Sequence, residues 1–322
     1  MGGKGCVVGG DREPTILARL PRKLTTGEYV GSINDFQSVP ATGYNLRIHH
    51  LPLSNLPSLP LMLGWLFPPK CPCSLPAKQW LEERLQWLSE QFDDHVFNGK
   101  PLVLPTEKYF PDPYDGSQVA VRRLVTRACG YMDVDPEMVE LKFVAQAGKL
   151  QFVNDAGQAI GQAAGTFKLR SDGTYRITID EQGLHDPMEL VGTIAHELAH
   201  ARLLGEYRLQ GDEFDHEITT DLTVVFLGMG IFLANVPRNW DSDRKKWPGT
   251  KLIRHEYMTR PMFSYALAHL AWFRGEKSPP WSEHLHFNAH PDFRQAVRYL
   301  FETEDSTFQP VKVRQKRQLR RE

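Results

Sequence analysis

The stretch His196-Glu197-Leu198-Ala199-His200 constrains what this chain can fold into more than any other segment. On a helix, two histidines four residues apart project from the same face, one turn from each other. That separation allows both imidazoles to reach one zinc ion at roughly 2.0–2.1 Å. The glutamate between them then lies where a general base is needed. The motif therefore predicts a metal-binding helix.

The residues around the motif predict a helix over 186–204. Asp186 suits the N-cap, and Pro187 suits the first helical position. Glu189 completes an Asp-x-x-Glu capping box, and Gly205 offers a stop. The apolar side of this helix consists of Met188, Leu190, Val191, Ile194, Leu198 and Leu203. Without a metal, the same segment fits an amphipathic core helix whose histidines bond to their neighbours.

A third metal ligand is expected on a second helix, predicted over 214–233. A catalytic zinc site uses three protein ligands and leaves one position for water. Glu217 is our first choice, and Asp221, one turn further on, can accept the outer N–H of a ligand imidazole. Asp215 and His216 are competing donors nearby. The third ligand therefore stays open among Glu217, Asp221 and His216.

This arrangement resembles the gluzincin branch of the zincin metallopeptidases. Their pattern is His-Glu-x-x-His, followed by a glutamate ligand on a later helix, often with an aspartate four residues beyond it. The residues that match are His196 and His200 (zinc ligands), Glu197 (general base), Glu217 (third ligand) and Asp221 (supporting aspartate). Thr220 departs from the pattern, because such families often carry a small alanine there. The resemblance covers a small part of the chain and describes the site.

The resemblance implies a zincin-like α+β fold, with a small mixed β-sheet, the motif helix and a mainly helical C-terminal part. The sequence itself predicts short strands before the motif, at 139–145, 150–153, 165–169 and 175–179. An Asp-Gly turn between the last two indicates a hairpin. In the family an edge strand binds extended substrate by backbone pairing. We expect residues 174–180, or their hairpin partner, to do so here.

Zincins commonly stabilise the oxyanion of the reaction with a Tyr or His from a later segment. A helix predicted over 261–273 contains Tyr265 and His269, and His255 and Tyr257 precede it. Tyr265 is our choice for this catalytic role, although sequence alone does not choose among the four. A buried structural role is the alternative for each of them.

Composition places the chain among globular proteins, with 322 residues, 41% of them hydrophobic and 24% charged. The predicted organisation is a poorly ordered segment over 1–60, rich in Gly and Pro, and one hydrolase domain over 61–309. A more protein-like stretch begins at Met62, so the preceding segment is a candidate start-site artefact. Six Lys or Arg then make 310–322 a basic, flexible tail. With a net charge of −1, nucleic acid is not expected as a partner except through this tail.

The four cysteines, Cys6, Cys71, Cys73 and Cys129, are too few and too scattered for a disulfide framework. They suit a reducing compartment, so a cytoplasmic location is expected. Cys71 and Cys73 are one residue apart, but no second pair completes a structural zinc site. The apolar run 224–234 is too short to span a bilayer, so we expect no membrane span.

The function expected from these features is that of a soluble Zn²⁺-dependent metallopeptidase, acting on a peptide or protein substrate. In the implied mechanism Glu197 activates a zinc-bound water, which attacks the peptide bond. The alternative is a non-catalytic zinc-binding or regulatory protein with a structural metal site, for which four protein ligands are expected. A third interpretation has no metal and a core helix at 186–204.

Overall fold

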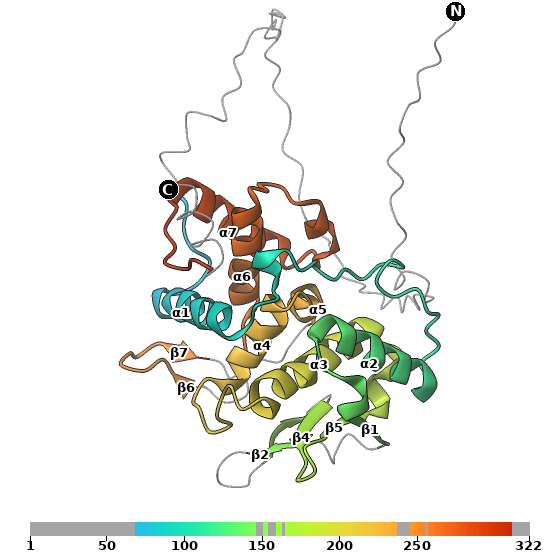
Figure 1. The fold of residues 1–322 in the computed structure, drawn as a ribbon. Helices are drawn as coiled ribbons and strands as arrows, with labels where there is room; N and C mark the ends of the chain where they lie inside the picture. The colour runs from blue at the N-terminus through green and yellow to red at the C-terminus, as the bar shows by residue number, and fades with distance from the viewer. Residues whose placement is uncertain are drawn as a thin grey trace, which may run out of the picture. The chain divides into compact units, whose positions relative to one another are not determined.

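A small mixed β-sheet precedes the motif helix, and helices dominate the rest of the described chain (Figure 1). The described residues contain seven α-helices and form a mixed α+β fold, which confirms the predicted class. From Pro69 onward they belong to one compact unit. The predicted segment 1–60, and the predicted tail from residue 311, lie outside the described residues. The computed structural model describes residues 68–145, 151–153, 159–162, 165–236, 245–254 and 257–310.

The main sheet consists of β1 (Val139–Val144), β4 (Gly165–Leu169) and β5 (Tyr175–Asp180), in the order β1-β5-β4. β1 runs parallel to β5, and β4 runs antiparallel to it, so the sheet is mixed. The β4–β5 hairpin turns at Gly173, whose φ of 83° is a left-handed value that glycine adopts freely. Because β5 pairs with both β1 and β4, it lies in the centre of the sheet. Of the two strands expected as the substrate-binding edge, 174–180 is therefore central, and its hairpin partner β4 lies at the edge.

Two short antiparallel pairs complete the described strands. β2 (Gln151–Val153) pairs with β3 (Ala159–Gln162), and β6 (Lys245–Lys246) pairs with β7 (Ile253–Arg254). The sequence predicts β2 but neither β3 nor the β6–β7 pair. Two-residue strands are too short to show the alternating pattern on which a prediction depends.

The motif helix α3 (Pro187–His200) begins where the sequence predicts it. The Asp186 side chain accepts hydrogen bonds from the backbone N–H groups of Met188 and Glu189, both at 3.0 Å. After His200 the chain continues as one π-helical turn, Ala201–Gly205. A Cβ atom on Gly205 would lie 2.5 Å from the ring of Tyr175, so glycine lets this ring of β5 lie against the end of the helix.

The predicted helix 214–233 is two helices, α4 (His216–Phe226) and α5 (Gly230–Asn235). The break falls at Gly228, whose φ is 103°. The carbonyl oxygen of Gly228 accepts a hydrogen bond from Val103 N–H at 2.8 Å, so a distant segment packs into the break. Apolar residues are buried on both sides of Gly228, and for this reason the hydrophobic pattern continues across the interruption.

The motif helix lies at the centre of the described fold (Figure 1). It packs against α2 (Gln118–Met132), α4, α5 and the edge strand β4. Further along, α6 (Arg260–Arg274) packs against α7 (His290–Thr303), and α1 (Leu75–Gln91) contacts α4 and α6. The sequence predicts α1, α2 and α6, but not α7. None of the described helices is long and apolar enough to cross a membrane.

We expect Asp186→Ala to reduce the free energy of unfolding by about 1 kcal/mol, because two N–H groups of the first turn of α3 lose their acceptor. Asp186→Asn is the matched control, since its amide oxygen still accepts at the N-cap. Urea denaturation of the three proteins measures the difference. Equal stability of wild type and Asp186→Ala would show that the cap does not stabilise α3.

Candidate metal centre

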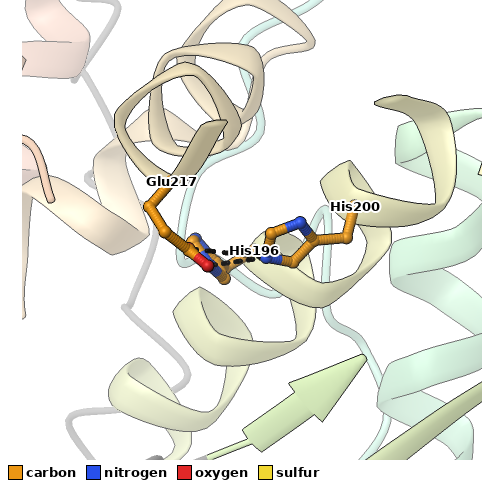
Figure 2. A group of neighbouring side chains, drawn as sticks. All are labelled: His196, His200 and Glu217. Atoms are coloured by element: carbon orange, nitrogen blue, oxygen red, sulfur yellow. Dashed lines mark hydrogen bonds and ion pairs between the residues drawn. The ribbon is translucent and has the colours of Figure 1, made fainter. Parts of the chain in front are cut away.

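Three donor atoms from two helices converge at one point (Figure 2). His196 and His200 project from α3, and Glu217 lies in the first turn of α4. Nε2 of His196 lies 3.2 Å from Nε2 of His200 and 3.1 Å from Oε2 of Glu217. Nε2 of His200 lies 3.5 Å from the same carboxylate oxygen. The two helices thus assemble a compact triangle of one oxygen and two nitrogens.

This triangle has the size that a tetrahedral zinc site requires. Ligands bound to zinc at roughly 2.0–2.1 Å in tetrahedral geometry lie about 3.3–3.4 Å from each other. The three measured separations, 3.1, 3.2 and 3.5 Å, fall on both sides of that value. Imidazole nitrogen and carboxylate oxygen are also donors that zinc accepts. The three residues therefore fit a zinc ion and would supply three of its ligand atoms.

Asp221 contacts Nδ1 of His196, the ring nitrogen that is not part of the triangle. One oxygen of its carboxylate lies 2.9 Å from Nδ1 of His196, and the other accepts the backbone N–H of Met258 at 2.9 Å. Because an ionised carboxylate only accepts hydrogen bonds, Nδ1 of His196 carries the proton. When the ring loses its second proton, as metal binding requires, its lone pair lies on Nε2, inside the triangle. This is the supporting role that the sequence predicts for Asp221.

Thr220 contacts Nδ1 of His200, as Asp221 contacts Nδ1 of His196. Its hydroxyl donates to the backbone carbonyl of His216 at 2.8 Å, and its oxygen lies 3.3 Å from Nδ1 of His200. A hydroxyl has one proton, so toward His200 it acts as an acceptor and Nδ1 carries the proton. Nε2 of His200 is then free to bind a metal. The departure from the family pattern at Thr220 thus has a defined structural role, which the sequence alone did not indicate.

The charges of the site set its protonation. Burial acts to lower the pKa of His196, but hydrogen bonds with Asp221 and Glu217 outweigh it and raise the pKa to about 10. Burial acts to raise the pKa of Glu217, yet attraction to His200 and hydrogen bonds with His196 hold it well below its usual range. The site therefore favours a positive charge between its carboxylates.

The competing donors have other partners. Both oxygens of Asp215 are bonded to α1: Trp80 Nε1 donates at 2.7 Å, and the Arg84 guanidinium donates at 2.8 and 2.9 Å. The Asp221 carboxylate bonds to His196 and Met258 as described. His216 lies outside the triangle, with its Nε2 2.9 Å from the second oxygen of Glu217. Among the predicted alternatives, Glu217 is the residue that the structure brings to both motif histidines.

Glu197 lies against the edge strand. It is buried, and a Cβ atom added to Gly165, the first residue of β4, would lie 3.1 Å from its Oε1 atom and 2.7 Å from Thr193. The absence of a side chain at Gly165 therefore allows the Glu197 carboxylate to lie beside β4. Phe167, also on β4, stacks on the His200 ring with centroids 5.8 Å apart. Sequence reasoning identified neither residue, because only the packing of β4 on α3 gives them a place in the site.

The structure does not support Tyr265 as the oxyanion-stabilising residue. Tyr265 is fully buried, and its hydroxyl donates to a carboxylate oxygen of Glu82 on α1 at 2.7 Å. Burial and this carboxylate raise its pKa far above the ordinary value, so the proton stays on Tyr265. His269 bonds to the Tyr265 carbonyl and to the Ser306 hydroxyl. Both residues therefore have the structural role that was the alternative for them.

Tyr257 is the described oxyanion candidate that lies beside the candidate metal ligand His196. Its ring centroid is 5.7 Å from that of His196, and the residue is half-buried. It immediately precedes Met258, whose backbone N–H bonds to Asp221. The remaining candidate, position 255, lies outside the described residues.

No protein-family model, curated protein or solved structure matches this chain. The function therefore has to be inferred from the geometry of the site itself. The structure brings together the predicted ligands His196, His200 and Glu217 and places Asp221 against His196. Glu197 is buried beside Gly165. Tyr265, the remaining predicted site residue, bonds to Glu82 instead.

Replacing Thr220 by Val should weaken zinc binding by roughly 10–100-fold, because the isosteric side chain no longer accepts the Nδ1–H of His200. Thr220→Ser keeps the hydroxyl and should bind zinc as wild type does. Competition titration with a chromophoric chelator measures both affinities. If Thr220→Val binds zinc as tightly as Thr220→Ser, the hydroxyl does not orient His200.

Zinc binding should release a proton, because His196 must be neutral to bind the metal and its pKa is about 10 without it. At pH values well below 10 the affinity is therefore expected to rise about tenfold per pH unit. Isothermal titration in buffers of different ionisation enthalpy counts the released protons. An affinity that does not change with pH would contradict the protonation assigned to His196.

Proposed function

We propose that this chain is a zinc-dependent hydrolase of zincin type that cleaves peptide bonds. The observation that carries the proposal is the triangle of His196, His200 and Glu217 atoms, with separations of 3.1–3.5 Å. Glu197 follows the first ligand on the same helix, as a general base should. The buried imidazole tautomers, oriented by Asp221 and Thr220, support a built metal site over a chance cluster of side chains.

When bound, zinc supplies Lewis acidity, which polarises a substrate carbonyl and makes water a stronger acid. The work of the protein's own groups is proton transfer and positioning. Glu197 takes the proton of the attacking water and passes it to the leaving amine. Its burial beside Gly165 holds the carboxylate in one place and limits its contact with bulk water. In this proposal Tyr257 replaces Tyr265 as the hydrogen-bond donor to the developing oxyanion.

A peptide is the substrate class that the neighbouring strand supports. Among the described strands, β4 lies at the edge of the main sheet and packs on α3. An extended peptide can add to such an edge by backbone hydrogen bonds, and the side of β4 near Gly165 adjoins Glu197. The scissile bond of a peptide bound there would be delivered to the general base.

One observation favours a second candidate, a structural zinc site. Nε2 of His216 lies 2.9 Å from Glu217, and its ring centroid is 6.0 Å from that of His200. A rotation of the His216 side chain could therefore supply a fourth protein ligand. A site closed in this way holds zinc but leaves no position for water, so it would not catalyse hydrolysis.

Metal content separates these functions from a metal-free core helix. Mass spectrometry of the purified protein should find one zinc per chain in wild type and none in His196→Ala, because one of the three donor atoms is removed. Glu217→Ala should bind zinc far more weakly. If wild type holds no zinc after reconstitution, the proposal is wrong, and His196 and His200 are residues of a core helix without a metal.

Glu197→Gln separates catalysis from metal binding. The amide cannot accept a proton from water, so turnover of a fluorogenic peptide library should fall by at least roughly 10²-fold, while zinc content stays at the wild-type value. His216→Ala is the companion variant: a catalytic site keeps its zinc and its activity, whereas a four-ligand structural site loses zinc affinity. Full activity of Glu197→Gln would show that Glu197 is not the general base.

A further inference from the structure

The outer face of the main sheet carries a row of charged side chains that ends at the edge strand. The strand registers place Glu140 of β1 beside Arg176 of β5, and Arg176 beside Lys168 of β4. Successive side chains of a strand point to opposite faces of the sheet. Phe167, the neighbour of Lys168, lies on the inner face against the His200 ring. Lys168 therefore points to the outer face, where it is exposed.

The positive charges of this face are balanced except at the edge strand. The Glu140 carboxylate accepts hydrogen bonds from the Arg176 guanidinium at 3.0 and 3.1 Å, and Arg170, the residue after β4, donates to the same carboxylate. Arg170 also lies 3.5 Å from a carboxylate oxygen of Asp172. Two guanidinium groups thus share two carboxylates. Among the described residues, the Lys168 ammonium has no acidic partner, so the row ends at the edge with an uncompensated positive charge.

We infer that Lys168 selects an acidic side chain of the substrate, an aspartate or glutamate in a peptide that extends the sheet at β4. The inference rests on the proposed hydrolase function, in which a peptide adds to this edge, and it specifies the chemistry of that peptide. Side chains that face each other across two neighbouring strands have Cβ atoms roughly 4.5–5.5 Å apart. A carboxylate on the added strand would therefore reach the Lys168 ammonium and supply the missing negative charge.

The same geometry disfavours a basic substrate residue at that position. A lysine or arginine opposite Lys168 would add a positive charge next to those of Lys168 and Arg176. Like charges that face each other across strands are destabilising, whereas opposite charges contribute favourably. Because the new pair would be exposed, salt would screen its attraction. We therefore expect a preference of roughly 1.5–5-fold for glutamate over glutamine at low ionic strength.

The spacing along β4 indicates where in the peptide the acidic residue lies. Gly165 adjoins the proposed general base Glu197, and Lys168 is three residues further along the strand. Since a strand rises roughly 3.3 Å per residue, the acidic side chain should lie about three residues from the scissile bond. It would point to the outer face, whereas Phe167 contacts His200 from the inner face. A change of charge at Lys168 should therefore alter the choice of substrate without altering the metal site.

The test compares the zinc-loaded full-length wild type with Lys168→Glu and Lys142→Glu on a mixed peptide library, with the cleaved bonds identified by mass spectrometry. Lys142 is the matched control, because it is exposed on the same outer face but belongs to β1, which β5 separates from β4. Wild type and Lys142→Glu should favour Asp or Glu at one position about three residues from the cleaved bond. Lys168→Glu should favour Lys or Arg at that position.

Peptides that differ only at that position, with Glu, Gln or Lys, measure the size of the preference. In wild type, kcat/KM should be roughly 1.5–5-fold higher for the Glu peptide than for the Gln peptide, and added KCl should reduce this ratio. In Lys168→Glu the order should reverse, with the Lys peptide cleaved faster than the Glu peptide. Zinc content should be the same in all variants, because Lys168 and Lys142 are not metal ligands.

The outcomes separate this inference from the function on which it rests. If wild type cleaves peptides without an acidic preference, or if Lys168→Glu keeps the wild-type preference, the inference is wrong and the hydrolase proposal stands. An equal change of preference in Lys142→Glu would also contradict it, because the effect would then come from net charge. If wild type with bound zinc cleaves no peptide, the hydrolase proposal is wrong, and the role of Lys168 is wrong with it.

Discussion

The buried carboxylate of Asp221 is the interaction on which the rest of the site depends. Its two oxygens bond to Nδ1 of His196 and to the backbone N–H of Met258, so one side chain connects α3, α4 and the segment before α6. Asp221 is fully buried, and removing one partner of a buried charge costs about 3–5 kcal/mol. The arrangement of these three segments is therefore coupled to the hydrogen bond that positions the His196 ring.

A second buried carboxylate, that of Asp215, ties the same helix to α1. It precedes α4 directly, but its oxygens bond to Trp80 and Arg84, so its side chain does not cap the helix. Its backbone carbonyl still accepts the N–H of Thr219 at 2.9 Å. Glu217 lies in this first turn, and its place beside the histidines thus depends on α1, more than 100 residues earlier in the chain.

Local signals in the sequence predicted the elements that local interactions determine. The cap at Asp186 depends on neighbouring residues, and the motif helix begins at Pro187 as predicted. The sequence does not predict the helix break at Gly228, because the hydrophobic pattern continues across it. A distant segment helps to define the break, since Val103 N–H donates a hydrogen bond to the Gly228 carbonyl. Sequence alone does not choose Tyr265 or another of the four oxyanion candidates, because the partner of each side chain depends on how its segment packs. Thr220 departs from the family pattern, and the sequence does not show its contact with His200, because that contact also depends on packing.

The sequence by itself determined the spacing of His196, Glu197 and His200 on one helix, since helical geometry follows from residue separation alone. Hydrophobic periodicity and turn residues also predicted several helices and short strands, which together make a mixed α+β chain. Only the tertiary structure decided that Glu217 completes the triangle, that Thr220 and Asp221 orient the two imidazoles, and that Glu197 lies beside Gly165. The physical reason is that these contacts join separate segments, whose distance in space is set by packing and has no counterpart in local sequence.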